Sequence, residues 1–294
     1  MRVERVLGPV DADEVRDLTV RAFAQPPALD PPSGALAEAA ESIASDFALD
    51  GGLQVRSPAG QLLATCRLRR RGLAWVLRRV AVDPEQHRRG LGRRLVTEAL
   101  AWAADEQVLR LHVGVRAARP ASRAFWVGLG FQPLAEHVFW HELVRPVPLV
   151  LPGSAATLAL GERLAGELRA GDLIVLSGPL GAGKTALTQG IGVGLGVRGA
   201  VTSPTFVLAR VHPGPLPLVH VDAYRLRDSG NRSLELDDLD LDAWLADSVT
   251  VVEWGEGMAE GLAEARLEIR LERPDEQSRT LTATPHGRRW SAFA

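Results

Sequence analysis

Lysine, cysteine and tyrosine each occur once in this 294-residue sequence, and methionine occurs only twice. The single cysteine, Cys66, excludes an internal disulfide and any zinc site built from several cysteines. The sequence also lacks an apolar run of about 18 residues, which a membrane-spanning helix would need. Its first residues do not have the charged and then apolar layout of a signal peptide, so we expect a cytoplasmic protein that does not bind a membrane.

The formal net charge of −2 excludes a global positive field that would draw the chain to nucleic acid. With 46% hydrophobic residues, a chain of this length is expected to form two domains. Prolines at positions 146, 148 and 152 forbid a helix between His141 and Ser154 and favour an extended connector. We therefore predict one domain over residues 1–146 and a second over 147–294.

Both predicted domains read as α/β. The first shows helical patterns at 11–24, 90–104 and 120–129, and strand patterns at 53–57, 61–69, 73–82, 109–115 and 138–144. In the second, Ser154 is expected to cap a helix that extends to about residue 168. Strands are then expected at 172–177, 206–211, 218–221 and 249–253, with a helix at 185–195. Strands that alternate with helices predict a mostly parallel sheet.

The lone lysine, Lys184, lies in the segment Gly178–Thr185, a full match to the phosphate-binding loop G-x-x-x-x-G-K-[ST]. A chain that otherwise uses arginine for its basic residues has a lysine at the position where a compact ammonium must fit between phosphates. A strand is predicted before the loop and a helix after it, which is the order of elements that such a loop requires. Its glycines allow backbone N–H groups to surround phosphate, and the Thr185 hydroxyl is suited to Mg²⁺.

Phosphoryl transfer also requires groups that hold metal and orient water. Asp222 and Glu253 each end a predicted strand, where the ligand crevice of an open α/β sheet lies. Either acid could instead be a solvated loop residue. Ser203 and Thr205 have hydroxyls of the kind that sense a γ-phosphate in a switch loop. The spacing of these residues is equally consistent with an ordinary turn.

Five segments of the second predicted domain occur in a family order and spacing, namely LSGPLGAGKT at 176–185, TSPTFVL at 202–208, HVDAYRL at 220–226, VVEWGE at 251–256 and LEIRLE at 267–272. Through these segments, residues 152–290 resemble the TsaE (YjeE) family of ATPases, which act in the synthesis of N6-threonylcarbamoyladenosine at position 37 of tRNA. The resemblance implies catalytic roles for Lys184, Asp222 and Glu253, and Mg²⁺ ligands in Thr185 and Glu253. It implies ATP binding by Ser154, Leu180, Gly181, Ala182, Gly183, Lys184 and Thr185.

The same resemblance implies partners. These are the tRNA threonylcarbamoyl transferase and its dimerising partner subunit, with tRNA reached only indirectly. Tyr224 and Trp254 also match positions that the family has, although Trp254 is equally consistent with an aromatic residue of the core. The family has Asp where this chain has Pro179, a difference that leaves the phosphate cradle intact but removes whatever that acid contributes.

The segment from Val80 to Leu95 has a strand, a glycine-containing turn and a helix start, again an anion cradle. It resembles the pyrophosphate-binding turn [Q/R]-x-x-G-x-[G/A] of the GCN5-related N-acetyltransferases (GNAT), with His87 in the first slot. A second family signature resembles the segment 125–131, FWVGLGF. The resemblance covers residues 1–146 and implies a GNAT acyl-CoA fold. It implies acetyl-CoA contacts from Val80, Val82, His87, Arg88, Arg89, Gly90, Leu91, Gly92 and Trp126.

Two groups that the GNAT family uses in catalysis are missing from this sequence. Trp126 stands where the family has a tyrosine as general acid, and an indole N–H does not supply a proton at neutral pH. The predicted strand at 73–82 also lacks a glutamate that would serve as base. Ten arginines between positions 67 and 94 could bind coenzyme A, contact tRNA or form a solvated face.

The sequence therefore supports two hypotheses of different classes. The first is a Mg²⁺-dependent ATPase of tRNA threonylcarbamoylation, fused to a domain that transfers acetyl from acetyl-CoA to an unidentified amine. The second is a non-catalytic assembly or sensor protein, in which the first domain only binds acyl-CoA or a partner and the second is a nucleotide-gated docking module. A small-molecule kinase is disfavoured because no lid or acceptor base is apparent near the loop.

Overall fold

The computed structural model describes residues 2–25, 29–204, 208–228 and 242–293. The chain divides into two compact units, Met1–Arg145 and Pro146–Ala294. Each unit has its own β-sheet with helices packed on it, so the α/β class predicted from the sequence is confirmed for both. Within the described ranges, no helix has the length and apolar character needed to cross a bilayer.

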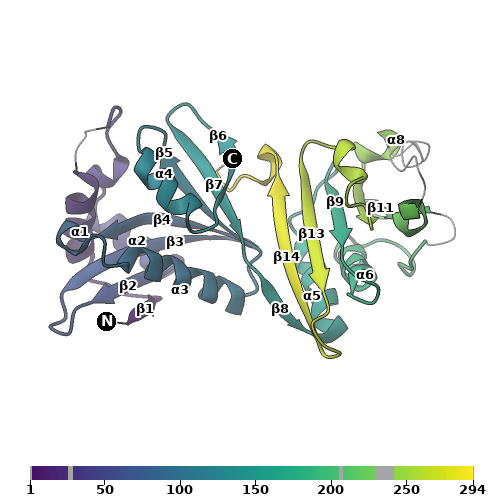
Figure 1. The fold of residues 1–294 in the computed structure, drawn as a ribbon, viewed down its shortest axis with the longest axis horizontal. Helices are drawn as coiled ribbons and strands as arrows, with labels where there is room; N and C mark the ends of the chain where they lie inside the picture. Colours follow the sequence, from purple (N-terminus) through teal and green to yellow (C-terminus); the bar gives the residue numbers. More distant parts are fainter. Residues whose placement is uncertain (1, 26–28, 205–207, 229–241, 294) are drawn as a thin grey trace. The chain divides into compact units, whose positions relative to one another are not determined.

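The strands of the N-terminal sheet follow the order β1-β2-β3-β4-β5-β7-β6 (Figure 1). Strands β1 to β4 pair antiparallel, as do β6 and β7, whereas β4 and β5 are parallel. The strands are β1 (Val3–Val6), β2 (Gly52–Arg56), β3 (Leu62–Arg71), β4 (Ala74–Val82), β5 (Arg110–Arg116), β6 (Gln132–Glu136) and β7 (Trp140–Pro146). The strands predicted around residues 53–82 and 109–115 are confirmed, with ends shifted by one or two residues.

The helices of this unit are α1 (Ala12–Phe23), α2 (Ala40–Leu49), α3 (Leu91–Asp105) and α4 (Pro120–Val127), with short 3₁₀ turns η1 (Gly34–Ala37) and η2 (Pro84–Gln86). The Asp11 carboxylate caps α1 by accepting a hydrogen bond from the Glu14 backbone N–H at 3.0 Å. Apolar side chains of α1 and α2 pack together and onto β3, forming a core of Val15, Leu18, Ile43, Phe47 and Leu62.

The C-terminal sheet has the strand order β10-β11-β12-β9-β13-β14-β8. Its strands are β8 (Leu149–Pro152), β9 (Leu173–Ser177), β10 (Ala209–His212), β11 (Leu218–Asp222), β12 (Val249–Glu253), β13 (Arg266–Glu272) and β14 (Ser278–His286). Strands β11, β12, β9 and β13 are parallel neighbours, and the outer pairs are antiparallel. The expected mostly parallel sheet is therefore a parallel centre with antiparallel edges. The expected strand at 206–211 begins at Ala209 in the structure, and positions 206 and 207 lie outside the described residues.

Helices α5 (Gly153–Ala165) and α6 (Lys184–Gly194) cross closely, and the short elements are α8 (Asp242–Leu245), η3 (Ala223–Asp228), η4 (Ala259–Gly261) and η5 (Arg288–Trp290). Glycine allows the close crossing. A Cβ atom on Gly190 would lie 2.0 Å from the Leu158 carbonyl oxygen, and one on Gly161 would lie 2.4 Å from that of Leu187. The backbone of α5 thus fixes the position of α6 and of the loop that precedes it.

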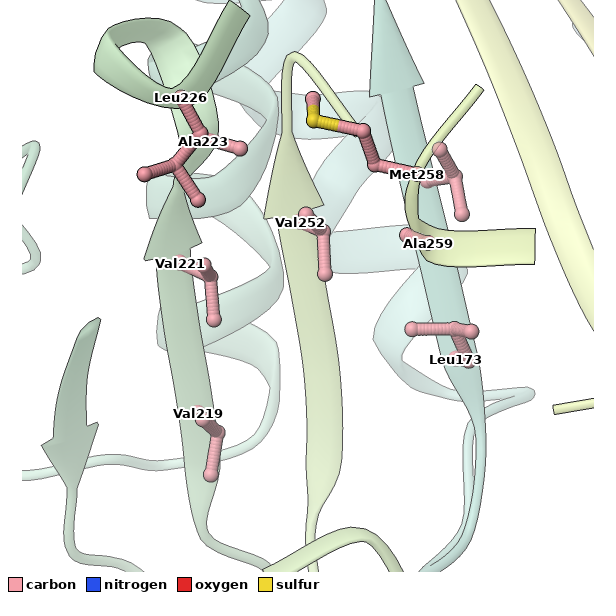
Figure 2. Packing of buried hydrophobic residues seen from close by; sticks show 9 residues of the cluster. Leu173, Val219, Val221, Ala223, Leu226, Val252, Met258 and Ala259 are labelled. Carbon is pink, nitrogen blue, oxygen red and sulfur yellow. The ribbon is translucent and has the colours of Figure 1, made fainter. Parts of the chain in front are cut away.

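One face of the parallel strands forms an apolar core. Figure 2 shows side chains of this cluster on β9, β11, β12 and the segments that follow β11 and β12, namely Leu173, Val219, Val221, Ala223, Leu226, Val252, Met258 and Ala259. Successive side chains of a strand point to opposite faces. His220, Asp222 and Glu253 alternate with the cluster residues along β11 and β12, so they belong to the other face.

The start of α5 differs from the expectation. Ser154 does not cap this helix: the cap position is Pro152, and Ser154 lies inside the first turn. The helix begins at Gly153, which has a positive φ of 78° and so turns the chain out of β8 one residue before the serine. The connector expected at 141–154 is extended as far as Pro152, but most of it belongs to strands, because β7 continues to Pro146 and β8 pairs with β14. Its last two residues, Gly153 and Ser154, are part of α5.

Among the α-helices and strands that the structure describes, seven lie outside the sequence-based expectations, namely β1, α2, β6, β8, α8, β13 and β14. Strand β1 has the sequence VERV, which does not alternate, and β8 lies in the proline-containing stretch that was interpreted as a connector. The cap position of α2 is Ala39, whose side chain has no hydrogen-bond acceptor, so the usual start signal is missing there. Strand β6 contains Pro133, a residue that reads against a strand.

Candidate functional site

The glycine-rich loop at 178–183 joins β9 to α6 and depends on glycine for its path. Gly178, Gly181 and Gly183 have φ angles of 132°, 74° and 106°. A Cβ atom on Gly178 would lie 1.9 Å from the Leu271 carbonyl oxygen, so no other residue fits there. The described residues supply no side-chain cap for α6, whose cap position is Gly183. The first backbone N–H groups of α6 are therefore available to an anion.

The side chain of Lys184 is only 4% exposed, although it carries a charge. Its Nζ atom donates hydrogen bonds to the carbonyl oxygens of Gly178 at 2.8 Å and Pro179 at 2.9 Å. The same atom lies 3.5 Å from the centroid of the Trp254 ring. The two loop carbonyls and the indole thus enclose the ammonium group.

Glu253 is 2% exposed and contacts the start of α6. Its Oε2 atom accepts a hydrogen bond from the Thr185 hydroxyl at 3.1 Å. Its Oε1 atom lies 2.8 Å from His220 Nε2 and 3.4 Å from Thr188 Oγ1. The structure thus brings together Thr185 and Glu253, which the sequence placed 68 residues apart. His220 and Thr188 were not predicted as site residues from the sequence, although the matching segment 220–226 begins with the histidine.

Asp222 lies beside Glu253, because the two residues are paired in the parallel register of β11 and β12. Its Oδ2 atom accepts a hydrogen bond from the Ser203 hydroxyl at 2.6 Å, and its Oδ1 atom accepts one from the Tyr224 backbone N–H at 3.1 Å. Ser203, assigned from the sequence to a switch segment, is thus in contact with this carboxylate. Thr205, the other residue of that assignment, lies outside the described residues.

A cavity of about 580 Å³ adjoins the outer side of the loop. Its lining includes Ser177, Gly178, Pro179, Leu180, Tyr224, Trp254, Glu256, Met258 and Arg270. The Tyr224 and Trp254 rings meet edge to face, with centroids 5.1 Å apart. Leu180 is 83% exposed, and Ser154 is exposed in the first turn of α5.

Oxygen atoms of a hydroxyl and a carboxylate, as in Thr185 and Glu253, are ligands that Mg²⁺ prefers. Among the described residues there is no group of three or more His, Cys, Asp or Glu side chains that could hold a metal ion. Mg²⁺ is usually held by one or two carboxylates together with substrate phosphates and water.

In the N-terminal unit, β4 and β5 separate part of the way along their length. They are paired from Ala74 and Arg110 to Leu77 and Val113, although β4 continues to Val82 and β5 to Arg116. The register of β3 and β4 shifts in the same region, because β4 has one residue more than β3 between two successive pairs. Arg79, in this bulge, has a positive φ of 50°. Bulges often lie beside functional sites, and the separation leaves strand backbone open to a ligand.

The turn after β4 leads into the start of α3. Arg88 and Gly90 have φ angles of 63° and 78°, and a Cβ atom on Gly90 would meet nothing within 4 Å. The described residues offer no side-chain cap for α3, so its first N–H groups are available to an anion. His87 Nε2 lies 3.3 Å from the Val82 carbonyl oxygen. Arg88 and Arg89 are exposed, whereas Leu91 is buried.

Two further residues of the predicted acetyl-CoA site belong to the packing around this turn. A Cβ atom on Gly92 would lie 3.2 Å from the Phe125 ring and 3.8 Å from Val82. Trp126 is only 5% exposed, and its ring meets those of Phe125 and Phe131 at centroid distances of 5.3 and 5.0 Å. Its indole is therefore part of the aromatic core of α4.

Several of the ten arginines between 67 and 94 have partners within the protein. Arg67, Arg78 and Arg79 form ion pairs with Glu38 and Asp46. Burial opposes the ionisation of Glu38, but hydrogen bonds from Arg79 and Arg67 outweigh it and lower the pKa of that carboxyl. These three guanidinium groups therefore neutralise partly buried carboxylates. The exposed arginines that remain for a ligand include those of the turn at 87–90.

Comparisons with known proteins give the same division of the chain. Residues 151–281 match the family profile of the threonylcarbamoyl adenosine biosynthesis protein TsaE, and residues 17–131 match that of the acetyltransferase (GNAT) family. The tRNA threonylcarbamoyladenosine biosynthesis protein TsaE of Streptomyces coelicolor is 62% identical over 140 residues, which are 45% of this chain and 92% of that protein. The protein of that name from Mycobacterium tuberculosis strain H37Rv is 53% identical over 144 residues, 47% of this chain and 86% of its own. The solved structure of Bacillus subtilis YdiB is 32% identical, covers 49% of this chain and 87% of that chain, and has a TM-score of 0.40.

Proposed function

Because this chain belongs to the TsaE family and carries a GNAT-family domain ahead of its TsaE domain, we propose that its C-terminal unit is a Mg²⁺-dependent ATPase acting in N6-threonylcarbamoyladenosine synthesis. The observation that carries the proposal is the convergence of Lys184, Thr185 and Glu253 at one loop. Lys184 is held by two loop carbonyls, and Thr185 bonds to Glu253. A structural loop would have no need of a buried ammonium at this place.

Each residue of this site has a separate task in the proposed reaction. The loop N–H groups and the start of α6 bind the phosphates of ATP, and Lys184 compensates their charge. Thr185 and Glu253 would hold Mg²⁺, which supplies further charge compensation at the phosphates when it is bound. Asp222, oriented by Ser203 and the Tyr224 N–H, accepts a hydrogen bond from the attacking water. Ser154 is proposed to lie near the nucleotide base.

The proposed partners are the tRNA threonylcarbamoyl transferase and its dimerising subunit, with tRNA contacted through them. Family membership is the support for this step. The test for the C-terminal unit is phosphate release from ATP by the full chain with Mg²⁺, alone and with those two proteins. Absence of hydrolysis in both conditions, with normal ATP binding, would leave only the docking function.

For the N-terminal unit we propose binding of acetyl-CoA and transfer of its acetyl group to an amine whose identity is open. The separation of β4 from β5 and the uncapped start of α3 support a site for the pantetheine arm and the pyrophosphate. The test is calorimetric titration of the full chain with coenzyme A and acetyl-CoA. Absence of binding would remove this proposal without affecting the ATPase.

A second candidate for this unit is an acyl-CoA sensor without catalysis. Two observations favour it, because Trp126 is buried in the aromatic core and the carboxylates of Glu38 and Asp46 are engaged by arginines. Trp126 thus supplies no exposed general acid, and Glu38 and Asp46 supply no base that is without an arginine partner. These two candidate functions are distinguished by measuring acetyl-CoA hydrolysis and acetyl transfer to a panel of amines in a chain that binds the cofactor.

A further inference from the structure

Glu253 is oriented from two sides. Its Oε2 atom faces the Thr185 hydroxyl, at 3.1 Å, where the metal is proposed to bind. Its Oε1 atom faces the buried imidazole of His220, whose Nε2 lies at 2.8 Å. Thr188 also lies near Oε1, but at 3.4 Å, and its hydroxyl is 3.0 Å from the Lys184 carbonyl oxygen. Of the two contacts that hold Oε1, the one with the imidazole is therefore the shorter.

The sheet brings His220 to this carboxylate. His220 is paired with Val251 in the parallel register of β11 and β12, two residues before Glu253. Side chains two residues apart on a strand share a face, so the imidazole and the carboxylate meet diagonally across the two strands. His220 has no exposed surface, so water does not compete for this hydrogen bond.

The hydrogen-bond partners of the imidazole show which of its two nitrogen atoms carries the proton and donates. Nδ1 of His220 is buried and has no hydrogen-bond partner within the described part of the chain. A proton on Nδ1 would be a buried donor without an acceptor, which is costly. The neutral ring with its proton on Nε2 avoids that cost, and Nε2–H then donates to Glu253 Oε1.

We propose that His220 is a positioning residue of the phosphoryl-transfer site: its Nε2–H holds Oε1 of Glu253 so that Oε2 stays directed at Thr185 and the metal. This inference rests on the proposed function of the site. Groups that hold a metal ligand from behind fix its orientation, and their removal typically lowers metal affinity or activity about 10- to 100-fold. His220 does not itself touch nucleotide or metal.

The test uses three variants of the full chain. His220→Phe keeps an aromatic ring but removes the donor, whereas His220→Gln carries an amide N–H near the position of Nε2. His212→Phe is the matched control, because His212 is also buried on the neighbouring strand β10, with its ring centroid 6.4 Å from that of His220. Two measurements are made: steady-state kinetics give kcat and KM for ATP over a Mg²⁺ titration, and calorimetry gives ADP affinity with and without Mg²⁺.

We expect His220→Phe to lower kcat, or to raise the Mg²⁺ concentration at half-saturation, roughly 10- to 100-fold. The gain in ADP affinity on adding Mg²⁺ should shrink, while ADP affinity without Mg²⁺ stays within about threefold of wild type. His220→Gln should recover most of the loss, and His212→Phe should show the Mg²⁺ dependence of wild type.

Wild-type Mg²⁺ dependence in His220→Phe would overturn the inference, as would a His220→Gln variant no better than His220→Phe. If His220→Phe does not fold, His220→Gln is compared with His220→Asn, whose shorter amide does not reach Oε1, and equal Mg²⁺ dependence of these two would overturn it. Failure of the proposed function is a different result, because wild type itself would then hydrolyse no ATP.

Discussion

The Nζ atom of Lys184 lies 3.5 Å from the centroid of the Trp254 indole. Trp254 has a positive φ of 62°, and its backbone N–H donates to the Leu176 carbonyl oxygen at 2.8 Å. The Tyr224 ring supports the indole from its edge. The only lysine of the chain is thus enclosed by two carbonyl oxygens and an aromatic ring, an arrangement that fits a compact ammonium.

We therefore expect Lys184→Ala to abolish ATP binding and hydrolysis, and Lys184→Arg largely to do so. The arginine keeps the charge but cannot occupy the same enclosure. Calorimetry with ATP and a phosphate-release assay measure both effects. If Lys184→Arg hydrolyses ATP within a few-fold of wild type, the assignment of this loop is wrong.

Asp222→Asn and Glu253→Gln should separate nucleotide binding from turnover. Loss of a carboxylate near the water or the metal removes transition-state stabilisation more than ground-state affinity. Both variants should retain ATP affinity within about tenfold while kcat falls on the order of 10²-fold or more. Normal turnover in either variant would show that its assigned role is incorrect.

Gly190→Ala should destabilise the C-terminal unit, because the added Cβ would lie 2.0 Å from the Leu158 carbonyl oxygen. Overpacking of this kind typically costs about 1–3 kcal/mol. Gly261→Ala is the control, since a Cβ there would meet nothing within 4 Å. Thermal unfolding of both variants and wild type should place only Gly190→Ala at a lower Tm. Equal midpoints for all three proteins would contradict the close crossing of α5 and α6.

Cys66 should make the stability of the protein depend on pH in the alkaline range. Burial raises the pKa of its thiol from the ordinary value of 9.0 to about 12. Below pH 9 the thiol is neutral in both folded and unfolded chains, so its contribution to stability is fully present there. As pH rises from 9 towards 12, the unfolded thiol ionises first and that contribution is lost, by about 1.4 kcal/mol per pH unit.

The measurement is denaturant unfolding between pH 8 and pH 10, with Cys66→Ala as the control that removes this titration. Wild type should lose stability relative to the variant only above pH 9. Native protein should also resist alkylation by iodoacetamide at neutral pH, because the thiolate is the reactive form. Rapid alkylation of the folded chain would contradict the burial of this side chain.

Gly90→Glu should block coenzyme A binding without unfolding the chain. The space around a Cβ at this position is open, so the protein itself accommodates a side chain, apart from the strain of its φ of 78°. A carboxylate there would meet the pyrophosphate and repel it. Binding to wild type should also weaken as salt rises. Unchanged affinity in Gly90→Glu, measured by calorimetry beside a thermal melt, would remove the cofactor assignment.

The glycine-rich loop could be predicted from the sequence because its geometry is local. Eight consecutive residues specify the φ angles, the start of α6 and the position of Lys184. Asp222 and Glu253 were predictable for a similar reason, since each follows a short run of apolar residues that reads as a strand. Local signals failed where they were ambiguous, as at Ser154, because the positive φ of Gly153 starts α5 before the serine.

Only the tertiary structure decided what these residues touch. The contact of His220 with Glu253 depends on the register of β11 against β12, and that of Lys184 with Trp254 depends on the neighbouring positions of β9 and β12 in the sheet. The pairing of Arg67 with Glu38 and Asp46 depends on how α2 packs on β3. Residue types and spacing along a chain specify local backbone conformation, but they do not specify strand register or helix packing. Those depend on the summed burial of many side chains, and they determine which groups of the two sites meet.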